Sequence, residues 1–148
     1  MALQYSTGFK DAVLDTGSFK GTFDDGYIRI YDGTMPADAD AALAGNTVLV
    51  TYSDNDAGFG VAGLDLEAAA VNGAISKATA QTWKGTAAAT SAGTFFRYIQ
   101  AADTGGASAT EIRIQGTVGG AGADLFLSTA DFVSTNEYTL DLFSISIP

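Results

Sequence analysis

Apolar and polar residues alternate along much of this chain with the period of two that is typical of β-strands. The pattern is strictest in the segment Tyr27–Tyr31, where two isoleucines face one way and Tyr27, Arg29 and Tyr31 face the other. The segment Thr47–Tyr52 is instead continuously β-branched and apolar. A run of this kind predicts a strand that is covered on both sides.

Turn residues divide the rest of the chain into further short strands. These strands are expected at residues 64–71, 74–77, 82–89, 94–99, 111–117 and 124–128. Asn72-Gly73 is the dipeptide that type I′ hairpin turns favour, and Ser91-Ala92-Gly93 predicts a second hairpin. Met35–Gly45 reads as a connection with one helical turn after Pro36, and Trp83 is expected in the core. The pattern favours an all-β fold, a β-sandwich or jelly roll.

The last predicted strand changes the phase of its alternation. Its apolar residues occupy even positions first and odd positions afterwards: Tyr138, Leu140 and Leu142, then Phe143, Ile145 and Ile147. Because a shift of one residue moves every side chain to the opposite face, this predicts a bulge or a strand that passes to another surface.

The N-terminal residues predict two short helical turns rather than strands. Ser6 or Thr7 can cap the first turn and Ser18 the second, with Gly26 as the stop. The paired aromatic and apolar residues at i, i+4 spacing are Phe9 with Val13 and Phe19 with Phe23. We therefore expect one domain over residues 1–148 whose residues 1–26 form a short helical segment.

Composition and charge narrow the classes of partner. Hydrophobic residues make up 47% and charged residues 16%, and the formal net charge is −10. Scattered basic residues in an acidic chain argue against nucleic acid, which is bound by clustered Lys and Arg. No stretch approaches the ~20 apolar residues of a membrane helix, and Met1–Lys10 has no secretory pattern. We expect a soluble protein that binds neither membranes nor nucleic acid.

The chain holds no cysteine and no histidine, which excludes thiolate nucleophiles, zinc–sulfur sites and Ser-His-Asp triads. Asp54-Asn55-Asp56 resembles the start of a calcium loop, but Phe59 stands where the sharp-turn glycine belongs. Asp24-Asp25 and Asp38-Ala39-Asp40 occupy positions suited to capping and turns. We expect no enzymatic activity, no metal ligand and no cofactor.

Several segments of the chain resemble a family of small virion proteins of tailed bacteriophages. They are MALQYSTGFKDAVLD, GYIRIYDGTMPADADAAL, NGAISKATAQTWKGTAAATSAGTFFRYI and LDLFSISIP. The resemblance covers most of the chain and rests on packing and turn residues. It implies a structural role on the phage particle, which is assembled in the host cytoplasm, and it carries over no active site.

A virion protein of this kind is expected to bind the major capsid protein or other virion proteins and to form a homo-oligomer. The foremost hypothesis is a head decoration (cement) protein. The alternatives are a neck- or tail-associated protein, and a carbohydrate-binding jelly roll that contacts the host surface. The predicted interface residues are Phe9, Val13, Phe19, Phe23, Tyr27, Arg29, Tyr31, Phe143, Ile145 and Ile147. The alternative for the terminal segments is that they fold back onto the sandwich.

Overall fold

A computed structural model describes residues 3–15 and 17–146 of the chain. The helices are α1 (Thr7–Asp15) and α2 (Phe19–Phe23). The strands are β1 (Gln4–Tyr5), β2 (Tyr27–Tyr31), β3 (Val48–Asp54), β4 (Ala74–Ser76), β5 (Trp83–Thr86), β6 (Ser91–Ala92), β7 (Phe95–Ile99), β8 (Arg113–Gly119), β9 (Leu125–Phe126), β10 (Asp131–Phe132), β11 (Glu137–Thr139) and β12 (Ser144–Ser146). The prediction of an all-β class with two short N-terminal helices is confirmed.

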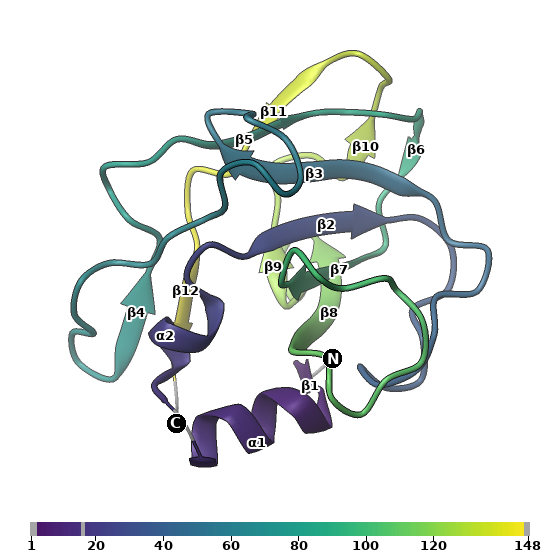
Figure 1. The fold of residues 1–148 in the computed structure, drawn as a ribbon. Coiled ribbons are helices and arrows are strands. Elements are labelled where there is room, and N and C mark those ends of the chain that lie inside the picture. Colours follow the sequence, from purple (N-terminus) through teal and green to yellow (C-terminus); the bar gives the residue numbers. More distant parts are fainter. Residues whose placement is uncertain (1–2, 16, 147–148) are drawn as a thin grey trace.

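The strands form one large sheet and two small ones. The large sheet has the order β1-β8-β7-β2-β3-β5-β11, and β9 joins β8 as a parallel neighbour. The small sheets are β10-β6 and β12-β4. Figure 1 shows the two helices and β12 beneath the long strands of the large sheet, with β4 to one side. The arrangement is sandwich-like, with the helices closing one end of it.

Local capping explains where the helices begin. The Ser6 hydroxyl accepts a hydrogen bond from the Phe9 amide at 3.1 Å, and the Ser18 hydroxyl accepts one from the Gly21 amide at 3.0 Å. Such side-chain acceptors satisfy amides that have no partner within the helix. Gly8 allows the start of α1 to approach the main chain, since a Cβ there would lie 2.3 Å from the Thr110 carbonyl oxygen. Helix α1 is therefore fixed at its first turn.

One face of the large sheet carries the hydrophobic core. The cross-strand partners Ile114, Tyr98, Ile28 and Tyr52 lie in one row across β8, β7, β2 and β3, and each is almost fully buried. Trp83 is also fully buried, and its ring lies 5.3 Å from that of Phe143. The expected position of Trp83 in the core is confirmed.

The Asn72-Gly73 turn is confirmed, whereas the second predicted hairpin is wrong. Asn72 and Gly73 have φ of 53° and 76°, and Val71 pairs with Ala74 across them. The strand at Trp83–Thr86 does not pair with the strand at Phe95–Ile99, because β5 lies between β3 and β11 while β7 lies between β2 and β8. The connection crosses from one part of the sheet to another, which its turn residues do not indicate.

Two other expectations change in detail. The connection 35–45 contains turns and bends but no helical turn after Pro36. The last predicted strand is two strands, β11 and β12, which belong to different sheets. The chain leaves the large sheet after Thr139, so the change of phase marks its passage to another surface.

Candidate docking surface

The predicted N-terminal interface residues pack largely on the protein's own core. Phe9 is 8% exposed and Phe23 is fully buried, while Val13 and Phe19 are partly buried against the core. Phe9 and Phe23 have ring centroids 5.3 Å apart, and Phe23 lies 4.6 Å from Tyr98 of the sheet. The helices therefore close the end of the core, as the alternative of folding back describes.

The predicted interface residues of the last strand have a similar position. Phe143 is 7% exposed and Ile145 is 9% exposed, and both belong to the core. Ile147 lies outside the described residues. The side chains of this strand that point outward are the serines Ser144 and Ser146.

The face formed by Tyr27, Arg29 and Tyr31 is covered by other parts of the chain. Tyr27 is 1% exposed and meets the Phe59 ring edge-on, and the Arg29 guanidinium carbon lies 3.7 Å from the centroid of the same ring. Tyr31 is 2% exposed and stacks on Phe95, and burial raises its pKa. Arg29 is the one of the three predicted residues that stays partly accessible.

The same sheet face carries a polar row, of which sequence reasoning identified only Arg29. Gln4, Gln115, Arg97, Arg29 and Thr51 are cross-strand partners in β1, β8, β7, β2 and β3. The Arg97 Nε donates to Gln115 Oε1 at 3.0 Å, and Gln115 Nε2 in turn donates to Gln4 Oε1. Such a row excludes simple hydrophobic packing on this side of the sheet.

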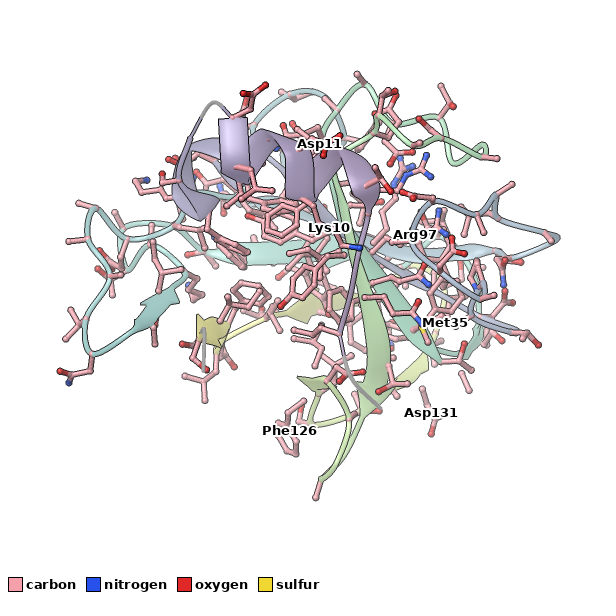
Figure 2. All side chains as sticks on the ribbon, turned by 90° about the horizontal axis from the view of Figure 1, so that it is seen from below. Lys10, Asp11, Met35, Arg97, Phe126 and Asp131 are labelled. Atoms are coloured by element: carbon pink, nitrogen blue, oxygen red, sulfur yellow. The ribbon has the colours of Figure 1, made fainter. Side chains whose placement is uncertain are left out.

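A loop that we call the cover loop, residues 34–46, lies over this polar row. Its carbonyl oxygens accept hydrogen bonds from the row: Ala41 from Arg97 at 2.8 Å, Pro36 from Gln115 at 2.9 Å and Ala37 from Gln4 at 3.0 Å. Figure 2 shows Arg97 and Met35 of the cover loop on the same side of the sheet. Side chains of the sheet thus satisfy the main chain of a loop that has no strand partner.

A buried ion pair lies beside the polar row. Arg113 and Asp103 form two hydrogen bonds, Nε to Oδ2 at 2.5 Å and Nη2 to Oδ1 at 2.9 Å, and their side chains are 0% and 2% exposed. The neighbouring Arg97 is 1% exposed, and its Nη1 has no hydrogen-bond partner. Burial, followed by repulsion from Arg113, lowers the pKa of Arg97. The space beneath the cover loop therefore holds more positive than negative charge.

The carboxylates suggested by the sequence accept hydrogen bonds from other parts of the chain, most of them distant in sequence. Asp24 accepts from the Leu66 amide at 3.0 Å and Asp25 from the Gly63 amide at 2.8 Å. Asp38 accepts from the Ala41 amide, and Asp56 accepts from Thr86. Over residues 3–15 and 17–146, no group of three or more Asp, Glu, Cys or His side chains is placed to hold a metal ion.

Exposed apolar side chains mark a different surface, at the end of the molecule away from α1. Phe126 of β9 is 62% exposed and Leu142 is 82% exposed. In Figure 2, Phe126 lies at the edge of the molecule opposite to Lys10 and Asp11 of α1. We call Phe126 and Leu142 the apolar ridge.

Two grooves lie against the apolar ridge. The larger has a volume of about 570 Å³ and the smaller about 150 Å³, and Phe126, Asp141 and Leu142 line both. The floor of the larger groove includes Phe96 and Phe143. A pair of exposed apolar side chains between grooves of this kind is an arrangement typical of protein contact sites.

Sequence reasoning missed this ridge although part of the signal was present. The strand at residues 124–128 alternates, and it places Leu125 and Leu127 inward, at 5% and 8% exposed. A phenylalanine at the outward position between them is the indication of a contact surface. Leu142 belongs to the even-numbered apolar positions of the last predicted strand, but the chain leaves the large sheet before reaching it.

Comparison with known proteins adds no relative. No protein-family model matches the chain, and neither curated proteins nor solved structures gave a match. Neither α1 nor α2, the helices of the described part of the chain, has the length and apolar character needed to cross a membrane.

Proposed function

We propose that this chain is a non-enzymatic structural protein of a tailed-bacteriophage particle, a head decoration protein that binds the major capsid protein. The apolar ridge of Phe126 and Leu142 is the observation on which the proposal rests. The resemblance of the sequence to small virion proteins is the reason for choosing the phage particle as the binding partner. The ridge is a surface by which the protein can bind to it.

The geometry of the ridge suits a binding role because its side chains are held but uncovered. Phe126 belongs to a strand that pairs with β8, and Leu142 stands between Leu140 and Phe143, which are 2% and 7% exposed. Both main-chain segments are therefore anchored in the core, and little ordering is needed on binding. A few apolar anchors of this kind supply most of the binding energy in protein interfaces.

The test is the binding of the purified chain to particles that lack it. The variant Phe126→Ser/Leu142→Ser should lose binding, since both anchors are removed without opening the core. The matched control is Leu14→Ser/Val71→Ser, which replaces apolar side chains that are 86% and 68% exposed elsewhere on the surface. Normal binding by the ridge variant, or equal loss by the control, would overturn the assignment of this surface.

Immunogold labelling and copy number in purified particles test the virion role itself. Hundreds of copies on the head support decoration, whereas a handful at the neck or tail would move the protein to that position. Absence from particles would refute the proposal, and selective binding on a glycan array would favour a carbohydrate-binding protein instead.

A further inference from the structure

The larger groove beside the apolar ridge has the size and lining of a peptide-binding groove. Its volume of about 570 Å³ lies within the range of small-ligand and side-chain pockets, roughly 300–1,000 Å³. Apolar walls come from Leu3, which precedes β1, from Phe96 of β7, and from Leu125 and Phe143. The groove therefore has room for more than one apolar side chain of a partner.

Open strand edges lie at this groove. Leu125 and Phe126 of β9 line it, and so do Ser144 and Ile145 of β12. Among the described residues, β9 pairs with β8 alone and β12 pairs with β4 alone, so each strand has one edge without a neighbour. An unpaired edge offers main-chain donors and acceptors to an added strand.

The charges around the groove favour a basic partner. Asp124 and Asp141 line it, and Asp141 has no hydrogen bond or ion pair with any residue in the described part of the chain. Lys77 also lines the groove, where its ammonium group donates to the Gln81 carbonyl oxygen at 2.9 Å, so two carboxylates and one ammonium group leave the lining with one net negative charge. A second copy of this chain carries the same net charge of −10 and is therefore a less favourable occupant of this groove than a basic segment.

We infer that the groove between β9 and β12 binds an extended segment of a partner protein, in which basic residues flank alternating apolar residues. Main-chain pairing holds the segment along a strand edge, its apolar side chains enter the groove beside Phe126 and Leu142, and a basic side chain pairs with Asp141. The inference rests on the proposed function, because it describes the part of the partner that this surface recognises.

Synthetic peptides of about ten residues test the inference directly. The first alternates valine with threonine and has lysine at both ends; the second has glutamate at both ends; the third keeps the lysines and replaces every valine by serine. By fluorescence anisotropy, the first should bind and the second should bind at least about tenfold more weakly. The third should not bind, because it lacks apolar anchors.

Variants locate the site. Asp141→Asn should weaken binding of the lysine peptide about threefold, the size expected for an exposed ion pair, and Leu142→Ser should abolish it. The control Asp11→Asn removes a charge on the opposite side of the molecule and should leave binding unchanged. Amide hydrogen exchange should slow in β9 or β12 when the lysine peptide is bound.

Several results would overturn the inference. Equal binding of the lysine and glutamate peptides, loss of binding in Asp11→Asn, or unchanged exchange in both strands each contradicts it. Self-association in sedimentation that Leu142→Ser abolishes would show that a second copy occupies the groove. None of these measurements uses particles, so the two proposals can fail separately. If virions are labelled but the lysine peptide does not bind, this inference alone is rejected. If the lysine peptide binds but virions are not labelled, the virion role alone is rejected.

Discussion

The two faces of the large sheet are both buried, but different forces hold them. On one face the row of Ile114, Tyr98, Ile28 and Tyr52 packs against helices and Trp83. On the other face the row that contains Arg97 and Gln115 binds the carbonyl oxygens of the cover loop. The same strands thus supply a hydrophobic core and a hydrogen-bonded one.

Because different forces hold the two faces, they should respond differently to substitution. Apolar burial is roughly proportional to area, so small deletions on the core face cost modest amounts. The polar face depends on complete pairing, because an uncompensated charge in a low-dielectric interior is costly. On the polar face, the change in the free energy of unfolding caused by a single substitution should therefore depend on whether a charge is left unpaired, rather than on the area removed.

The largest effect is expected from Asp103→Ala. This variant leaves the fully buried Arg113 without its counter-ion, and we expect a loss of about 3–5 kcal/mol in the free energy of unfolding measured with urea. The control is Asp11→Ala, an exposed position on α1 that should change stability by less than about 0.5 kcal/mol.

A double variant sharpens this prediction. Asp103→Ala/Arg113→Met removes both charges, so it should be more stable than Asp103→Ala alone. If the double variant is less stable than the single one, the contribution of Arg113 is packing rather than charge, and the contrast between the two faces fails.

Tyr98→Phe tests the polar atom that lies within the apolar face. The Tyr98 hydroxyl donates to the Phe23 carbonyl oxygen at 3.1 Å, and burial raises its pKa. Removing the hydroxyl deletes this bond, but the same carbonyl oxygen still accepts from the Gly26 amide at 3.0 Å, so the expected cost is that of one hydrogen bond, about 0.5–1.5 kcal/mol. Thermal or urea unfolding measures the change, and a neutral result would indicate that the ring alone matters here.

Arg97→Met should cost less than about 1 kcal/mol. It leaves the Gln115 Oε1 atom and the Ala41 carbonyl oxygen without this donor, but it also removes the buried Nη1 that has no partner and the repulsion with Arg113, and these gains offset most of the cost. Urea unfolding is again the measurement. A loss as large as that of Asp103→Ala would show that Arg97 is fully satisfied in solution.

The smallest effect is expected on the stability of the fold at acid pH. Hydrogen bonds from Thr7 hold the pKa of Asp40 below its ordinary value, and they join the cover loop to the start of α1. A carboxylate whose pKa is lowered in the folded state stabilises the fold at pH values above its pKa in the unfolded chain, about 3.9. This contribution is lost as the pH falls below that value. We expect less than about 1 kcal/mol, because solvent screens a carboxylate near the surface.

Asp40→Asn is the matched variant for this acid dependence. Its stability should fall less steeply below pH ~4 than that of the wild-type chain, since the substituted side chain no longer titrates. If the curves of stability against pH are parallel for the variant and the wild-type chain, the cover loop is held by its hydrogen bonds to the polar row instead.

Local patterns predicted much of this fold. The strand at Tyr27–Tyr31, the cap at Ser18 and the turn at Asn72-Gly73 each depend on neighbours in sequence, and all three are found. The burial of Arg97 and Arg113 depends instead on cross-strand register and on a loop elsewhere in the chain. An arginine in an alternating strand ordinarily predicts an exposed face, so neither position could be recognised.

The order of strands also has a consequence for synthesis. Strand β1 pairs with β8, and β2 pairs with β7 as well as with the neighbouring β3, so β1 and one edge of β2 need partners that the ribosome adds much later. Until those partners emerge, Phe9, Phe23 and Ile28 have no sheet to cover them, and chaperones or other nascent chains can bind them. Strand β11 at one edge of the large sheet follows all the other strands of that sheet along the chain. The large sheet is therefore complete only once β11 has been made, and the yield of the protein in a cell depends on how long those apolar side chains stay uncovered.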